Sequence, residues 1–464
     1  MRVDSRAPLI TTVTVSGAAL RSLAADYATR YPVFFDSAAS GPLARFSMLA
    51  CEPVAMLMRD ADGKLSAHHR DLVAGGFLDN LDAWYRSEAT SPAPDGAPKP
   101  LPFLGGWFVY LGYEVAAEIE PRVRMPRADT PYSAFALRVD NFAVHDLADG
   151  RVYAISQSGD PAAHARLIRD LEQADGPTAA ADAPPPELAA LDEETPELFL
   201  ARVRTAKEYI AAGDIYQANL SRRWHLRLRD RAAAGQVYNA LRRANPAPFA
   251  ASVQWNGWSI FSSSPERLLR ITGREISTRP IAGTRARQGS PEQDRRDTAE
   301  LVAHPKERAE HVMLIDLERN DLGRVCEAGS VTVDEYMVTE SYAHVHHIVS
   351  NVRGRLRSDR SPVDALRALF PGGTITGCPK VRCMQIIAAL EGVGRGAYTG
   401  SLGWLDTDGD ADFNILIRTL TLRGDAIELR AGAGIVADSI PEKELEETRA
   451  KARGLLRAFG EAPR

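Results

Sequence analysis

The sequence is poor in cysteine and in lysine, and it has no excess of positive charge. It has 464 residues and only four cysteines, none spaced as Cys-x-x-Cys, so it predicts neither a disulfide framework nor a cysteine-rich zinc site. Seven lysines stand beside 49 arginines, a skew that base composition can produce but that makes each lysine position informative. The formal net charge of -5 argues against a nucleic-acid-binding protein, which normally has a basic face.

Long apolar segments are missing as well. The longest uncharged run, residues 244–265, contains prolines and polar residues, and it predicts two strands joined by Asn256-Gly257, the commonest hairpin turn. Threonines and serines interrupt the N-terminal stretch 9–20, which alternates like a strand and does not have the pattern of a signal peptide. We therefore expect a cytoplasmic protein that binds neither membranes nor nucleic acids.

Two proline-rich stretches, 91–102 and 174–196, are expected to be loops or linkers, because they cannot bury enough apolar surface to order themselves. The second one predicts an N-terminal region (1–175), a linker or loop (176–196) and a C-terminal region (197–464). The C-terminal region is expected to begin with a helix capped by Thr195, followed by a strand, 214–221, that has Gln217, Asn219 and Ser221 on one face. Further helices are expected near 306–317, 363–369, 381–390 and 441–459, and strands near 343–352, 400–405, 413–422 and 426–431. Strands and helices do not alternate regularly, which favours an α+β fold.

Two pairs of glutamates could hold a metal ion. Glu307 and Glu310 are three residues apart on one predicted helix, and Glu444 and Glu447 are three apart on another, with Lys451 one turn further on. Two such faces brought together could hold Mg²⁺, which prefers carboxylate oxygens. From spacing alone, two solvated helix surfaces are the commoner outcome.

Two glycine-rich segments precede or follow predicted regular structure. Residues 372–380 combine glycines, hydroxyls and a lysine just before a helix, which suits either an anion site or a plain turn. Residues 431–436 follow a strand and would let a ligand approach the backbone closely. The spacing of a P-loop, of a dinucleotide site and of a G-x-S-x-G elbow is absent, and no cysteine sits in a nucleophile context. If nitrogen is transferred, the ammonia must come from elsewhere.

Taken together, these segments resemble the chorismate-utilising enzymes, a family that includes the large subunits of anthranilate synthase and aminodeoxychorismate synthase and their isochorismate and salicylate synthase relatives. The matching segments are 213–221, 264–267, 279–285, 306–325, 373–387, 417–419 and 431–451, with looser matches at 34–37 and 103–113. The resemblance implies an anthranilate synthase component I-like fold, in which two packed antiparallel β-sheets are flanked by helices.

The resemblance also implies the roles of individual residues. Glu310 and Glu447 match glutamates that bind Mg²⁺, which grips the ring carboxylate of chorismate, and Glu307 and Glu444 lie beside them. A second set is implied to contact the two carboxylates and the rest of the substrate: Thr374, Tyr398, Arg418, Lys451 and the backbone of Gly432 and Gly434. Glu266 and His347 match positions implicated in proton transfer, and Glu266 is expected to help the C4 hydroxyl leave by general acid catalysis.

Some residues bear on which family member the chain resembles. Gln217 stands where the water-using relatives carry a lysine, which favours ammonia as the nucleophile and places Gln217 in the catalytic set. Residues 371–377, 400–401 and 34–37, together with Asn414, resemble aminodeoxychorismate synthase. Against these stands Ala282, because several of those enzymes have a nucleophilic lysine there and the anthranilate enzymes have alanine.

We therefore expect component I of aminodeoxychorismate synthase, which makes 4-amino-4-deoxychorismate from chorismate and ammonia for p-aminobenzoate and folate synthesis. A separate glutamine amidotransferase subunit is expected to supply the ammonia, and another protein to release pyruvate. The first alternative is anthranilate synthase component I, which makes anthranilate and pyruvate. A further alternative is a catalytically inactive chorismate-binding regulatory subunit.

Overall fold

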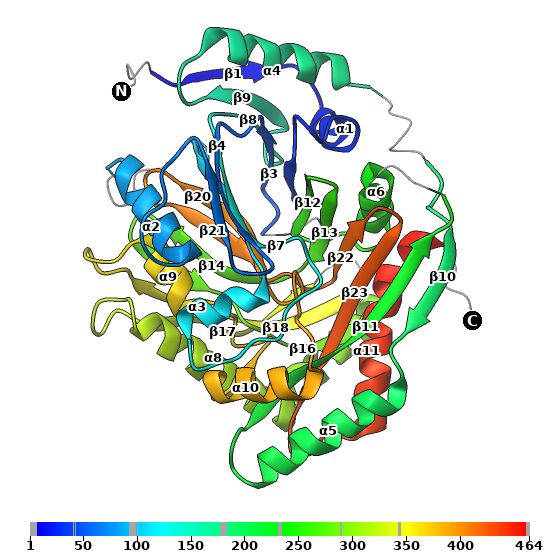
Figure 1. The fold of residues 1–464 in the computed structure, drawn as a ribbon. Helices are drawn as coiled ribbons and strands as arrows, with labels where there is room; N and C mark the ends of the chain where they lie inside the picture. Colours follow the sequence, from blue (N-terminus) through cyan, green and yellow to red (C-terminus); the bar gives the residue numbers. More distant parts are fainter. Residues whose placement is uncertain are drawn as a thin grey trace.

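Two large antiparallel β-sheets form the centre of the protein (Figure 1). The computed structural model describes residues 7–39, 41, 43–91, 99, 101–176, 183–230, 234–287, 290–341 and 345–460. The first sheet has the strand order β1 (Leu9–Val13), β9 (Arg151–Ser156), β8 (Asn141–Asp146), β3 (Phe46–Cys51), β2 (Val33–Asp36), β12 (Phe249–Trp255), β13 (Trp258–Ser264), β22 (Thr419–Arg423), β23 (Ala426–Ile435), β11 (Gln217–Leu228) and β10 (Leu188–Glu193), with β19 (Gly377–Cys378) paired to β11. The second has the order β16 (Ile281–Ala286), β18 (Val345–Arg355), β15 (Glu275–Thr278), β14 (Arg267–Thr272), β21 (Ala411–Asn414), β20 (Ser401–Asp406), β6 (Gly106–Leu111), β7 (Tyr132–Val139), β4 (Ala55–Asp60) and β5 (Leu65–His68), with β17 (Thr332–Ser341) paired to β18.

Each sheet takes one block of strands from the N-terminal region and one block from the C-terminal region. The blocks meet once in the first sheet, where β2 pairs with β12, and once in the second, where β6 pairs with β20. The predicted α+β architecture of two packed antiparallel sheets is therefore confirmed.

Aromatic side chains fill the space between the two sheets. Phe103 lies at the centre of this core, with its ring centroid 4.7 Å from that of Phe142 in the first sheet. The same ring lies 5.3 Å from Phe108 and 5.7 Å from Trp404, both in the second sheet. Tilted and edge-on contacts of this kind add to the stability gained by burying the rings.

Helices cover the outer faces of both sheets (Figure 1). Those packed on the first sheet are α1 (Ala18–Asp26), α4 (Pro161–Ala174), α5 (Pro196–Ala211), α6 (Ala234–Ala244), α10 (Lys380–Glu391) and α11 (Pro441–Leu456), which continues into η2 (Arg457–Phe459). Those on the second are α2 (Phe77–Glu88), η1 (Tyr113–Val115), α3 (Ala116–Ile119), α8 (Pro305–Gly323) and α9 (Pro362–Leu369), and α7 (Pro291–Ala303) contacts β16. Within the described ranges, none of these helices is both long and apolar enough to cross a lipid bilayer.

Local signals in the sequence predicted several elements correctly. The hairpin at Asn256-Gly257 joins β12 to β13, and both residues have positive φ, +48° and +75°, as a type I′ turn requires. The helices expected near 306–317, 363–369, 381–390 and 441–459 are α8, α9, α10 and α11.

Other predictions differ from the structure. Residues 413–422 form parts of two strands, β21 and β22, which belong to different sheets. Leu188–Glu193, within the expected linker, forms the edge strand β10 because β11 offers it a free edge. Thr195 takes the N-cap position of α5, but its side chain forms no capping hydrogen bond.

Candidate active site

The predicted site lies where the chain passes from one sheet to the other. Glu266 lies between β13 of the first sheet and β14 of the second, and Arg418 lies between β21 of the second sheet and β22 of the first. The two crossovers are joined by backbone hydrogen bonds, from Ile415 N–H to the Glu266 carbonyl (3.0 Å) and from Ser263 N–H to the Arg418 carbonyl (3.0 Å). The fold therefore brings together two residues that are 152 positions apart in the sequence.

The backbone of Arg418 is in an unusual conformation. Its φ of +51° lies in the left-handed region, which costs a non-glycine residue about 1 kcal/mol or more and persists only where the surroundings fix it. Burial lowers the pKa of Arg418, and the nearby Glu266 opposes this effect. The guanidinium nevertheless keeps its charge at neutral pH, so it can bind an anionic group.

Glu266 is a buried carboxyl that holds a proton near neutral pH. Its side chain is only 5% exposed. Burial raises the pKa of Glu266 to about 7, although Thr374 and the positive charges of Arg418 and Lys451 act in the opposite direction. Its Oε1 has no hydrogen-bond partner in the described part of the chain. Such a group can give a proton to a substrate at physiological pH.

His347 lies in β18 and is buried. Burial and the charge of Arg418 lower the pKa of His347 to about 3. The imidazole is therefore neutral at pH 7. Of the two residues expected to transfer protons, only Glu266 has a pKa near the working pH.

Glycines in β23 leave room for side chains from facing segments. A Cβ atom on Gly432 would lie 2.6 Å from the hydroxyl oxygen of Tyr398 and 2.7 Å from Oδ1 of Asn219. A Cβ atom on Gly434 would lie 2.7 Å from Nε2 of Gln217. The absence of a side chain at both positions is thus what allows Tyr398, Asn219 and Gln217 to pack over this strand.

Lys451 connects the same strand to α11. Its ammonium group donates a hydrogen bond to the Gly432 carbonyl (2.8 Å) and pairs with Glu447 (2.8 Å) one turn earlier on the helix. The side chains of Lys451 and Glu447 are 44% and 48% exposed, so both remain accessible to a ligand.

Several buried polar atoms at the site lack a hydrogen-bond partner among the described residues. Besides Glu266 Oε1, they are Gln217 Oε1, Asn219 Oδ1, Thr374 Oγ1 and Thr376 Oγ1. Most buried polar atoms in folded proteins are hydrogen-bonded, so a group of unsatisfied ones indicates a place for a polar ligand or for water. The electrostatic and hydrogen-bond contacts given above link Glu266 with Thr374, Arg418 and Lys451, and Lys451 in turn with Gly432 of β23.

The four predicted metal ligands lie on two helices. Glu307 and Glu310 are in the first two turns of α8, which packs against β16, β18 and α9. Glu444 and Glu447 are on α11, which packs against β23 and α5. Within the described ranges, no three acidic, histidine or cysteine side chains lie close enough together to hold a metal ion. Mg²⁺, which is commonly held by one or two carboxylates together with substrate oxygens and water, stays a prediction for these two helix faces.

The structure shows what surrounds Ala282, which stands where some relatives have a nucleophilic lysine, and Lys380, the lysine of the 372–380 segment. Ala282 is 7% exposed in β16. Lys380 pairs with Asp321 and donates a hydrogen bond to the Leu369 carbonyl (3.1 Å). These contacts keep its amine from acting as a nucleophile. Neither Ala282 nor Lys380 therefore supplies a free amine that could replace the missing lysine nucleophile.

The N-terminal match at 34–37 borders a separate cavity. Asp36 at the end of β2 accepts hydrogen bonds from Arg242 (2.5 Å) and from the Tyr238 hydroxyl (3.1 Å). Asp36 and Ser37 contribute to the lining of a cavity of about 550 Å³ between the sheets. Arg267, which directly follows Glu266 in the sequence, lines the same cavity.

Reasoning from the sequence did not select two residues that border the pocket, Asn219 and Arg395. Asn219 shares a strand face with Gln217, a signal that was available in the alternation of β11. Arg395 lies between α10 and β20 and is 3% exposed, and an arginine in a connecting segment gives no sequence signal that it will be buried.

Comparison with known proteins agrees with this geometry. Residues 44–457 match the family described as chorismate binding enzyme. Aminodeoxychorismate synthase component 1 of Bacillus subtilis is 39% identical over 446 residues, which cover 93% of this chain and 92% of that protein. Anthranilate synthase component 1 of Streptomyces coelicolor is 41% identical over 442 residues, covering 91% and 82% respectively. The crystal structure of anthranilate synthase component I from Streptococcus pneumoniae is similar with a TM-score of 0.77 at 31% identity, covering 90% of this chain and 93% of that one.

Proposed function

The chain belongs to the chorismate-binding enzymes, and from this premise we propose that it is component I of aminodeoxychorismate synthase, an enzyme that aminates chorismate at C4. The family assignment makes it a chorismate-utilising enzyme. The relatives include both aminodeoxychorismate and anthranilate synthases, so the position of amination is the part that the proposal adds.

The observation that carries the chemistry is the buried carboxyl of Glu266, whose pKa burial raises to about 7, near the guanidinium of Arg418. In the proposed reaction the C4–O bond of chorismate breaks, the oxygen leaves as water after it receives the proton of Glu266, and a C4–N bond forms with ammonia. Hydroxide is a poor leaving group, so protonation by a carboxyl with a pKa of about 7 directly assists this step. Ammonia needs no strong base to become a nucleophile, which agrees with a neutral amide at Gln217.

The two carboxylates of chorismate require positive charge and hydrogen-bond donors. We assign Arg418, Lys451 and Tyr398 to them, together with the backbone around Gly432, which Lys451 already contacts. Thr374 supplies a hydroxyl close enough to Glu266 to lower the pKa of that carboxyl. Glu310 and Glu447, with Glu307 and Glu444 beside them, would hold Mg²⁺. When bound, the metal would neutralise the ring carboxylate of a dianionic substrate in an acidic protein.

Amination at C4 is supported by sequence signatures around the pocket. The 371–377 segment, Ser401 and Asn414 resemble aminodeoxychorismate synthases. Asn414 and Ser401 join β20 to β21, because Asn414 Oδ1 accepts from Leu402 N–H (3.0 Å) and Ser401 Oγ donates to the Asn414 carbonyl (2.6 Å). A separate glutamine amidotransferase would supply ammonia, and a second enzyme would release pyruvate on the route to p-aminobenzoate and folate.

One observation favours a second candidate, anthranilate synthase component I. Ala282 is buried in β16 where several aminodeoxychorismate synthases have a lysine that attacks C2. Alanine cannot form that covalent intermediate. In this alternative, ammonia attacks C2 and elimination of pyruvate gives anthranilate.

Incubation of the purified chain with chorismate, Mg²⁺ and ammonium chloride tests the proposal. Mass spectrometry should detect 4-amino-4-deoxychorismate, without anthranilate fluorescence and without release of pyruvate. Anthranilate and pyruvate in equal amounts would establish the alternative. If no condition gives turnover, the chain is a chorismate-binding subunit without activity. The Glu266→Gln variant, prepared in parallel, is the control for contaminating enzymes.

A further inference from the structure

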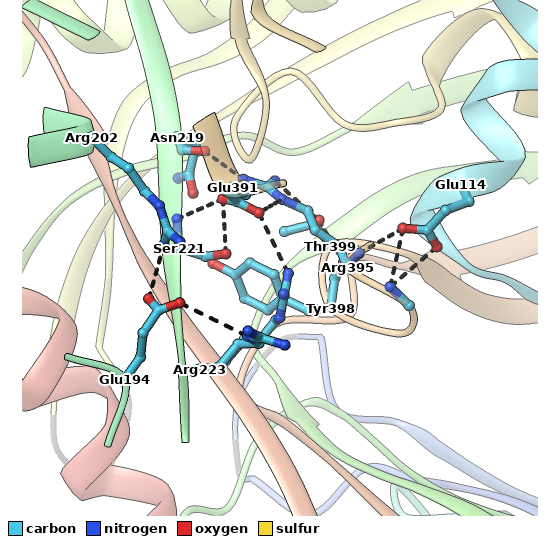
Figure 2. A network of polar contacts seen from close by, with 12 residues as sticks. Glu114, Glu194, Arg202, Asn219, Ser221, Arg223, Glu391, Arg395, Tyr398 and Thr399 are labelled. Carbon is cyan, nitrogen blue, oxygen red and sulfur yellow. Dashed lines mark hydrogen bonds and ion pairs between the residues drawn. The ribbon is translucent and has the colours of Figure 1, made fainter. Parts of the chain in front are cut away.

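Arg395 is a buried arginine within a network of polar contacts that also includes Glu391 and Asn219 (Figure 2). Its guanidinium forms two hydrogen bonds with the carboxylate of Glu391, the last residue of α10, at 3.0 Å from Nε and 2.7 Å from Nη2. Glu391 also accepts from the backbone N–H and the hydroxyl of Ser221 (2.8 and 2.9 Å). Burial raises the pKa of Glu391, but the charges of Arg395 and Arg430 and the hydrogen bonds from Arg395 and Ser221 together outweigh it, so the pKa lies below its ordinary value. The pair is therefore ionised and fixed.

The same guanidinium also contacts three other segments. Nη2 donates to the Asn219 carbonyl in β11 (2.6 Å), and Nη1 donates to the Ile375 carbonyl (3.3 Å) and to the Thr399 hydroxyl (3.3 Å). Two of these contacts are to residues adjacent to ones assigned to the substrate. Ile375 follows Thr374, and Thr399 follows Tyr398.

The third contact is to a residue near Gln217 in the sequence. Asn219 lies two residues after Gln217 on the same face of β11, and its own Oδ1 faces Gly432. The backbone around Arg395 is held in turn from the N-terminal region. Its N–H donates to Glu114 (2.6 Å), and its guanidinium lies 4.8 Å from the ring centroid of Tyr113.

We propose that Arg395 is a positioning residue that sets the spacing between β11, the 372–377 turn and the 398–399 turn, the three segments that carry Gln217, Thr374 and Tyr398. The proposal rests on the proposed use of this pocket for chorismate, but not on which ring carbon is aminated. An arginine suits the task because its planar fork can bind several carbonyl and carboxylate oxygens at once in a fixed geometry. A lysine in its place has one nitrogen and cannot span the three segments.

The rival interpretation is that Arg395 only neutralises Glu391. Arg430 offers a matched control, because it is equally buried, with 2% side-chain exposure against 1%, and it also pairs with Glu391 (3.4 Å). Among the described residues its ionic partners are Glu391 and Glu428, and neither lies next to Gln217, Thr374 or Tyr398 in the sequence. Replacing either arginine by lysine preserves the positive charge beside Glu391. A loss of activity in Arg395→Lys but not in Arg430→Lys would therefore indicate a positioning role.

The test uses the full chain and the variants Arg395→Lys, Arg430→Lys and Thr399→Val. Equilibrium dialysis with Mg²⁺ gives the Kd for chorismate, and loss of chorismate absorbance with ammonium gives kcat and the KM of each substrate. Thermal unfolding identifies variants that do not fold. We expect Arg395→Lys to lose about 10- to 100-fold in kcat/KM for chorismate, because small displacements of binding groups have effects of this size. The KM for ammonium and the pH midpoint of activity should stay the same. In Thr399→Val, kcat/KM for chorismate should also fall, but by a smaller factor. In Arg430→Lys it should equal that of the wild type.

Two results would overturn the proposal. One is an unchanged chorismate Kd and KM in both Arg395→Lys and Thr399→Val. The other is an equal loss in Arg430→Lys, which would reduce the role of Arg395 to charge balance. If Arg395→Lys does not fold, Thr399→Val alone decides. A wild type that binds chorismate without aminating it would refute the proposed function, while the Kd values would still decide the role of Arg395.

Discussion

Replacing Glu266 with glutamine should weaken catalysis and strengthen the fold. Glutamine has nearly the same shape but cannot give up a proton, so the general acid of the proposed mechanism is lost. General acid catalysis typically contributes about 10²- to 10⁴-fold, and we expect kcat/KM for chorismate to fall by that factor. In the wild type, kcat/KM should also decline as the pH rises through about 7, where Glu266 loses its proton.

The gain in stability follows from the same buried carboxyl. Its pKa rises from 4.5 to about 7 on folding, and each pKa unit corresponds to about 1.4 kcal/mol. Below pH 4.5 the group is protonated in both the folded and the unfolded state and costs nothing. Between pH 4.5 and 7 only the unfolded state loses the proton, so the folded state loses stability relative to it. Above pH 7 the cost reaches about 3 kcal/mol, and glutamine removes it.

Urea unfolding of wild type and Glu266→Gln without substrate, at intervals from pH 4 to pH 8.5, measures this difference. The two unfolding free energies should agree near pH 4, and the variant should be more stable by about 3 kcal/mol at pH 8.5. A difference that does not change with pH would refute the raised pKa. A stabilised variant that retained full activity would instead refute the role of Glu266 as proton donor.

Three further perturbations test other parts of the structure. Glu391→Gln should lower the unfolding free energy by about 3–5 kcal/mol at pH 7, because it leaves the buried charge of Arg395 without a carboxylate; urea unfolding measures this, and a neutral effect would contradict the ionised pair. Gly432→Ala should raise the chorismate KM and destabilise the fold by about 1–3 kcal/mol, because its Cβ would lie 2.6 Å from a tyrosine oxygen. Gly454→Ala in α11, where a Cβ meets nothing within 4 Å, is the matched control; it should leave the chorismate KM unchanged and stabilise the fold by about 0.5–1 kcal/mol. Removal of Mg²⁺ with a chelator should abolish turnover and leave the thermal unfolding midpoint nearly unchanged, and added Mg²⁺ should restore the wild type but not Glu310→Gln. A chelated enzyme that remains active would disprove the metal assignment.

Local chemistry made part of the fold predictable. The Asn256-Gly257 hairpin depends on two residues that tolerate positive φ, and α11 depends on its own periodicity, so both could be predicted from short segments. Residues 413–422 could not, because the change of sheet at Arg418 depends on the neighbouring crossover at Glu266. The edge strand β10 likewise exists only because β11 lies beside it.

The sequence predicted those residues of the candidate site that lie within motifs of the family. Glu266, Thr374 and Arg418 came from such motifs, and the structure places them near one another. Arg395 did not, because its importance lies in three contacts to backbone or hydroxyl groups of distant segments. Contacts of this kind depend on the whole fold, and residue type and spacing do not encode them.

The two seams, which are the strand pairs β2–β12 and β6–β20 that join the N-terminal and C-terminal blocks, determine how the protein responds to a break in its backbone. A backbone break after Ala174, where α4 ends, and before Leu188, where β10 begins, severs no strand. The nicked halves should therefore elute together from a gel-filtration column. Expressed singly, each half would expose two unpaired strand edges, β2 and β6 on one, β12 and β20 on the other. Exposed edges of this kind recruit other chains, so fragments made alone should aggregate, and co-expression should rescue them. Exchange of halves between relatives would succeed only where both seams remain complementary.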